Sequence, residues 1–207
     1  MYASLLIADV VIIGMKYVLL GEDFSMNKMS IKTVVAVGIG AALFFVLARF
    51  VAIPSGVPNT NISLQYAVLA LFAVMYGPVA GGLIGFIGHT LCDLSWGGSP
   101  WWSWIIASAL VGVIIGLVSK KIRLSDGVFG KKEIILFVAV TLIAMAVCWV
   151  GVAPVLDILI YAEPADKVFL QGVVAFIFNF LTAAIVGGLL MFAYTKTVSK
   201  SGSLKQE

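Results

Sequence analysis

The sequence predicts an all-α integral membrane protein, folded as a compact bundle of six transmembrane helices with both termini in the cytoplasm. Of its 207 residues, 62% are apolar and only 11% are charged, whereas soluble domains are about half apolar and about a quarter charged. The mean hydropathy is +1.13. These values exclude a disordered chain. Because each span needs about 20 apolar residues, six spans leave no room for a separate soluble catalytic domain.

The first three spans are expected within residues 33–94. The first covers residues 33–53 and ends at a Pro- and Gly-rich segment, 54–62. The apolar stretch 64–94 is interrupted by Gly77-Pro78, a dipeptide that favours a turn or kink. At 1.5 Å per residue this stretch could form one kinked helix of about 46 Å or two short spans.

Three further spans are expected at residues 101–118, 133–153 and 168–194. The placement of basic residues decides between five spans and six. If the stretch 64–94 forms two spans, ten of the thirteen lysines and arginines face the cytoplasm, in agreement with the positive-inside rule. These ten are Lys28, Lys32, Lys120, Lys121, Arg123, Lys131, Lys132, Lys196, Lys200 and Lys205. Six spans are therefore the better prediction.

The chain divides into a membrane domain, 26–198, and two flanking segments. Residues 1–25 are apolar but carry Asp9 and Lys16 and lack the features of a signal peptide. They are interpreted as an extension from a mis-assigned start codon, with a genuine extra helix as the open alternative. Residues 199–207 form a polar cytoplasmic tail.

Small residues recur every four positions in three of the spans, which places them on one helix face. The series at 77, 81 and 85 and the series at 108, 112 and 116 are interpreted as internal packing surfaces. In the first span, Gly38 and Ala42 form a flat face that could dock another membrane subunit.

Motifs for common chemistries are missing from the sequence. It contains no HExxH, no GxSxG and no P-loop, so the chain is not expected to be an enzyme or to hydrolyse ATP itself. The single histidine argues against a His-built metal site, and the two cysteines have no CxxC spacing. No metal, cofactor or nucleic-acid partner is expected.

Polar and aromatic side chains gather toward the predicted outer side of the bundle. His89 and Asp93 lie four residues apart on one face of the third span, and Asn179 lies about 16 Å below the outer end of the sixth. Because such groups are costly in a membrane, they usually face a cavity or pair with one another. We expect a pocket open to the outside that suits a ring-shaped ligand. The candidate substrate-binding residues are Asn59, Asn61, Gln65, His89, Asp93, Trp96, Trp102, Trp149, Asp157, Glu163 and Asn179.

Ordinary structural roles remain alternatives for several of these residues. His89 and Asp93 could pair with each other or cap a helix end, and the tryptophans could form an interfacial belt. Asp157 and Glu163 could be solvated loop charges. Arg49 could extend to lipid headgroups.

Several stretches resemble the substrate-binding (S) components of energy-coupling factor (ECF) vitamin transporters. The similarity covers about residues 26–197 and points to a branch labelled riboflavin-type or hydroxymethylpyrimidine-type. The stretches are Met26-Asn27-Lys28, Gly38-Ile39-Gly40-Ala41-Ala42-Leu43, Leu64-Gln65-Tyr66-Ala67, Gly77-Pro78, Gly85-Phe86-Ile87-Gly88-His89, Gly98-Ser99-Pro100-Trp101-Trp102-Ser103-Trp104 and Ala153-Pro154-Val155-Leu156-Asp157-Ile158-Leu159-Ile160-Tyr161.

This resemblance implies a six-helix protein in the bacterial cytoplasmic membrane that captures a vitamin or precursor from outside. It implies partners: a transmembrane coupling (T) subunit and two ATPase subunits, on which the S component topples to expose its pocket inward. The family's Ala-x-x-x-Ala docking motif corresponds here to Gly38 and Ala42. The loop between the first two helices, 54–62, is expected to act as a lid with Asn59 and Asn61 at its tip.

Three other functions compete with this one. A free-standing secondary transporter would need its own coupling-ion site and usually an internal repeat, and neither is visible. An intramembrane enzyme would need a nucleophile beside His89 and Asp93. A purely structural subunit would not need the outward polar cluster.

Overall fold

The computed structural model describes residues 29–198, and within this range most residues are helical. The first four helices are α2 (Ile31–Phe50), α3 (Gln65–Tyr76), α4 (Pro78–Ser95) and α5 (Trp102–Gly116). Between α2 and α3, strands β1 (Ile53–Pro54) and β2 (Asn61–Ile62) pair antiparallel. A short 3₁₀ turn, η1 (Leu124–Asp126), follows α5. The predicted all-α class is confirmed apart from this two-stranded hairpin, which was not predicted.

Two long helical stretches complete the chain. The first joins α6 (Lys131–Met145), the π-helical segment η2 (Ala146–Val152) and α7 (Ala153–Tyr161). The second joins α8 (Ala165–Thr182), the π-helical segment η3 (Ala183–Gly187) and α9 (Gly188–Thr197). They have 31 and 33 residues, so the predicted spans 133–153 and 168–194 were too short.

The prediction of the fifth span was wrong because it ended the helix near Pro154. A proline normally breaks a helix because it lacks an N–H and its ring clashes with the carbonyl four residues earlier. Here π-helical η2 immediately precedes α7, and its wider turn accommodates the proline. The helix therefore continues to Tyr161. Asp157, which was predicted in an external loop, lies on α7 and is buried.

The predicted break inside 64–94 is confirmed. Gly77 lies between α3 and α4 and caps both helices. Its φ is +88°, a backbone conformation that residues with a Cβ rarely adopt. Within the described residues, three helical stretches are long and apolar enough to cross a membrane: α2, α6–α7 and α8–α9. Helices α3 and α5 are apolar but shorter, so the count of six spans and the cytoplasmic termini remain predictions.

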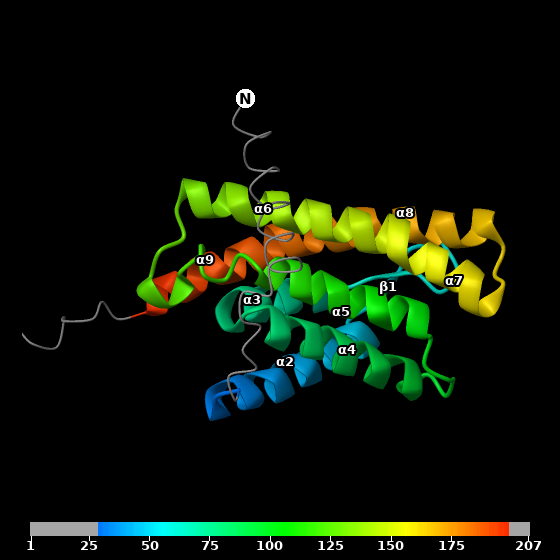
Figure 1. Cartoon of the computed structure of the whole chain (residues 1–207), viewed down its shortest axis with the longest axis horizontal. Coiled ribbons are helices and arrows are strands. Elements are labelled where there is room, and N and C mark those ends of the chain that lie inside the picture. The colour runs from blue at the N-terminus through cyan, green and yellow to red at the C-terminus, as the bar shows by residue number, and fades with distance from the viewer. Residues whose placement is uncertain (1–28, 199–207) are drawn as a thin grey trace, which may run out of the picture.

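The helices form a layered bundle in which α3 and α5 lie between α2 and α4 on one side and the two long stretches on the other (Figure 1). Helix α4 packs closely on α5. A Cβ on Gly81 would meet the backbone of Gly112, and one on Gly85 would meet the backbone of Ser108. The two series of small residues are therefore internal packing surfaces, as predicted.

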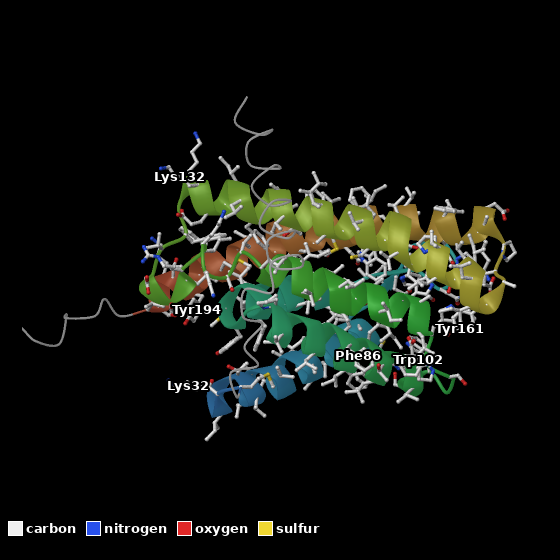
Figure 2. The ribbon with its side chains drawn as sticks, viewed as in Figure 1. Lys32, Phe86, Trp102, Lys132, Tyr161 and Tyr194 are labelled. Atoms are coloured by element: carbon white, nitrogen blue, oxygen red, sulfur yellow. The ribbon has the colours of Figure 1, made fainter. Side chains whose placement is uncertain are left out.

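The two ends of the bundle differ in chemistry. Lys32, Lys132 and Tyr194 lie at one end, and Trp102 and Tyr161 lie at the other (Figure 2). The interpretations of segments 1–25 and 199–207 fall outside the described residues.

Candidate functional site

A cavity of about 600 Å³ lies among the helix ends at the end of the bundle opposite Lys32 and Lys132. Helices α3 and α5 contribute residues near their starts, and α4 contributes its last two turns. The end of α2, the hairpin loop, the α4–α5 connection, η2, α7, the α7–α8 connection and α8 complete the wall. The lining residues are Ala48, Asn59, Thr60, Asn61, Gln65, Tyr66, His89, Cys92, Asp93, Trp96, Gly98, Ser99, Trp101, Trp104, Trp149, Asp157, Glu163, Lys167, Gln171, Ala175 and Asn179.

Aromatic rings form one wall of this cavity. Trp149 stacks on Trp104 with a centroid distance of 5.5 Å and an interplanar angle of 23°. Tyr66 meets Trp149 edge-on at 5.3 Å. The indole of Trp149 is nearly buried and donates its Nε1 hydrogen to the Met145 sulfur at 3.2 Å. Packing of this kind fixes the ring planes before any ligand arrives.

The buried carboxylate of Asp157 joins three side chains of the α5 region to α7. Its Oδ1 accepts hydrogen bonds from Trp101 Nε1 and Ser103 Oγ, and its Oδ2 accepts one from Trp104 Nε1 at 3.0 Å. Asp157 is only 2% exposed. The alternative that it is a solvated loop charge is therefore wrong.

A second polar chain starts at Asp93 and runs inward. His89 Nε2 lies 3.6 Å from an Asp93 oxygen, and His89 Nδ1 shares a hydrogen bond with Ser108 Oγ. Ser108 Oγ also bonds the Tyr66 hydroxyl at 2.7 Å. A serine, a histidine and an aspartate thus meet, as in a hydrolase triad. However, Ser108 is fully buried and does not line the cavity, so it cannot reach a substrate as a nucleophile.

Asn179 lies at the deep end of the cavity. It is 14 residues from the start of α8, a depth of about 21 Å rather than the predicted 16 Å, because the helix begins earlier than expected. Asn179 is 5% exposed, and among residues 29–198 no hydrogen bond engages its side-chain amide. A buried amide facing a cavity without a protein partner is available to a ligand.

The rim carries two contacts that connect α8 to its surroundings. Lys167 Nζ lies 2.6 Å from Glu163 Oε2, so these two side chains form a salt bridge. Gln171 Nε2 donates to the carbonyl oxygen of Pro58 at 2.8 Å and connects α8 to the hairpin loop. In that loop, Asn59 has a φ of 59°.

All the candidate residues except Trp102 line this cavity. Trp102 is the first residue of α5 and comes directly after the N-cap residue Trp101. Because a helix turns by about 100° per residue, its ring points elsewhere. It stacks on Phe86 at 6.1 Å and is 42% exposed.

Eleven of the lining residues were missing from the candidates, among them Tyr66, Trp101, Trp104 and Gln171. The three-residue spacing of Trp101 and Trp104, which places both on one helix face, could have identified them. Nothing in the sequence could have indicated that Gln171 bonds the carbonyl oxygen of Pro58.

Arg49 lies over an aromatic ring at the end of α2. Its guanidinium carbon lies 3.9 Å from the centroid of the Trp96 ring, a cation–π contact.

The two small-residue pairs of α2 face opposite directions. A Cβ on Gly40 would collide with Ile84, so the pair of Ala36 and Gly40 packs inside the bundle. Gly38 and Ala42 are exposed, and nothing lies within 4 Å of a Cβ built on Gly38. This second pair leaves a small-residue face open on the outside of the bundle.

Comparisons with known proteins agree over nearly the whole described chain. The model of the family described as "ECF-type riboflavin transporter, S component" matches residues 28–196. The UPF0397 protein of Exiguobacterium sp. (strain ATCC BAA-1283 / AT1b) is 56% identical over 182 residues, covering 88% of this chain and 100% of that relative. A UPF0397 protein of Clostridium perfringens (strain ATCC 13124) is 54% identical, covering 87% of this chain and 98% of its own length. No solved structure matches the chain.

The family model matches nearly all of the described residues, and the structure places apolar helices around a polar and aromatic cavity. The chain is a membrane protein that belongs to the ECF-type riboflavin transporter S component family.

Proposed function

We propose that the chain is the high-affinity substrate-capture subunit of an ECF-type importer for a small heteroaromatic vitamin or precursor. The cavity carries this proposal, because its volume of about 600 Å³ lies within the usual range of ligand sites, about 300–1,000 Å³. Stacked indoles suit the faces of a flat ring. The amides and carboxylates suit its edges. Hydroxymethylpyrimidine, pyridoxine-like compounds and riboflavin all have this character.

The proposed topology has six spans with both ends in the cytoplasm, in the bacterial cytoplasmic membrane. The positive-inside rule supports it, because the basic residues lie in the segments around Lys32, in the α5–α6 connection and at the end of α9. With these ends inside, the cavity faces outward, where a scarce solute would be captured.

The proposed partners are a transmembrane T subunit and two ATPases, because this chain has no phosphate-binding motif of its own. Gly38 and Ala42 would form the docking face on α2, on which the chain topples to release its ligand inward. A free-standing secondary transporter is the alternative. Uptake that requires co-expressed ATPases would separate the two.

Tryptophan fluorescence of the purified protein in detergent tests ligand capture. Four indoles, those of Trp96, Trp101, Trp104 and Trp149, line the cavity, so a bound flat ring should quench them. Titration with B-vitamins and their precursors should identify one ligand that binds below about micromolar concentration. If a protein with intact helical circular dichroism binds no compound in the panel, the capture function is wrong.

Replacing Asn179 with alanine should weaken binding of that ligand about tenfold. An unmade hydrogen bond in a buried site costs about 1–3 kcal/mol, and 1.4 kcal/mol corresponds to a factor of ten. Trp149→Phe should weaken binding by about fivefold through loss of stacking area. Trp102→Phe is the matched control and should change the affinity less than twofold, because Trp102 lies off the cavity. If the two tryptophan variants changed the affinity equally, Trp149 would not be part of the ligand-binding wall.

The hairpin loop is proposed to act as a lid that the Gln171–Pro58 hydrogen bond holds closed. A net hydrogen bond contributes about 0.5–1.5 kcal/mol, so Gln171→Leu should accelerate ligand release about two- to tenfold in stopped-flow measurements. Thr90→Val is the control, because it removes a hydrogen bond to the Phe86 carbonyl outside the cavity. If the Gln171 variant released the ligand at the wild-type rate, the Gln171–Pro58 hydrogen bond would not hold the loop closed.

A further inference from the structure

The charged groups that face the cavity are unequally paired. Glu163 is paired with Lys167 at 2.6 Å, and Asp93 lies 3.6 Å from His89. Within residues 29–198, no lysine, arginine or histidine forms an ion pair with Asp157. Asp157 is therefore the cavity-lining carboxylate that lacks a positive partner.

Asp157 is held by neutral donors alone. Its hydrogen bonds come from two indole N–H groups and one hydroxyl, which satisfy part of a carboxylate's capacity of about four lone-pair sites. All three donors are neutral, so none of them supplies a positive charge. A buried charge without an opposite charge is costly, and more so inside a membrane. Such a charge is usually retained where a ligand completes the pair.

The surrounding rings also favour a positive ligand. The electron-rich face of an indole attracts cations that approach within about 6 Å of its centroid. At the rim of the cavity, the Arg49 guanidinium already occupies such a position over Trp96. Trp104 and Trp149 are stacked on each other close to Asp157 and line the cavity, and no lysine or arginine among residues 29–198 lies over either ring.

On the basis of the capture function above, we propose that the substrate is an organic cation: a planar heteroaromatic ring that carries a positive charge on a ring nitrogen or on an attached amine. Its ring lies against the Trp104–Trp149 wall, and its charge lies beside the Asp157 carboxylate. A neutral ring of the same shape binds less well because it leaves this carboxylate uncompensated. A phosphorylated or carboxylated ring is rejected by repulsion.

Matched pairs of probes that differ by one methyl group and one charge test this assignment. N-methylquinolinium is compared with quinoline, and 1-methylnicotinamide with nicotinamide, by fluorescence titration of the wild-type protein at neutral pH. In each pair the cation should bind at least about tenfold more tightly. Equal affinities within both pairs would overturn the proposal, whatever the variants do.

Asp157→Asn separates charge from positioning, because the amide retains a carbonyl acceptor and nearly the same volume. This variant should weaken the binding of N-methylquinolinium at least about tenfold and the binding of quinoline less than about threefold. Ser103→Ala is the control, because it removes one hydrogen bond to Asp157 but keeps the charge. Ser103→Ala should weaken the binding of both probes by the same small factor. If Asp157→Asn weakened both probes equally, the carboxylate would only orient the indoles.

The failures of the two proposals are distinguishable. A neutral vitamin that binds below micromolar concentration while both cations fail would overturn the cation assignment and leave the capture function in place. A folded protein that binds neither the vitamin panel nor either member of each pair would overturn both.

Discussion

Replacing Gly112 with alanine is expected to lower the apparent Tm of the purified protein by roughly 5–10 °C. A Cβ at this position would point at the backbone of Gly81 and Gly82 on the facing helix. Backbone atoms cannot move aside as a flexible side chain can, so α4 and α5 must separate. Overpacking by a methyl group in a rigid contact costs about 1–3 kcal/mol, which corresponds to a shift of several degrees in a chain of this size.

Gly151→Ala provides the matched control for this prediction. Nothing lies within 4 Å of a Cβ built on Gly151, and the residue is exposed on η2. The same chemical change should therefore leave the Tm unchanged or raise it slightly, because alanine favours helix over glycine by about 1 kcal/mol. Melting followed by circular dichroism at one scan rate measures both variants. A Gly112→Ala protein as stable as the control would show that the two helices do not meet at this point.

The sequence contained enough information for this packing but not for the helix ends. Glycines four residues apart indicate a close helix contact, and the series at 81 and 85 does meet the series at 108 and 112. By contrast, the predicted fifth span stopped at residue 153, although the helix continues to Tyr161 through Pro154. The π-helical turn that accommodates it depends on long-range packing, including the close approach of Gly172 on α8 to the Trp149 carbonyl.

The same distinction applies to the cavity. Polarity within an apolar chain pointed to His89, Asp93 and Asn179, since such residues need partners wherever the helices place them. Polarity alone could not show that Asp157 is buried, because that depended on the length of α7. Residue type does not distinguish Trp102 from Trp101 and Trp104, and only the helix rotation shows which tryptophans of the run turn inward.

Replacing Gly38 with tryptophan is expected to lower energy-dependent uptake at least about tenfold without changing ligand affinity. Gly38 and Ala42 lie exposed on α2, one helical turn apart, and the small face that they form allows another helix backbone to approach closely. An indole at position 38 would hold the partner helix away. It would not disturb the fold, because nothing in the described chain lies within 4 Å of a Cβ at this position.

Leu189→Trp distinguishes docking from a general effect of a bulky group on the lipid-facing surface. Leu189 on α9 is 62% exposed and does not line the cavity, so this variant should bind and transport normally. Uptake is measured in cells that co-express the T subunit and both ATPases, and binding is measured on the purified chains by fluorescence. Normal uptake by Gly38→Trp would show that the T subunit docks elsewhere. Loss of uptake in both variants would instead indicate faulty membrane insertion. Because α2 has one pair of small residues packed inside the bundle and another exposed, Gly40→Trp should behave differently again and lose ligand binding together with the fold.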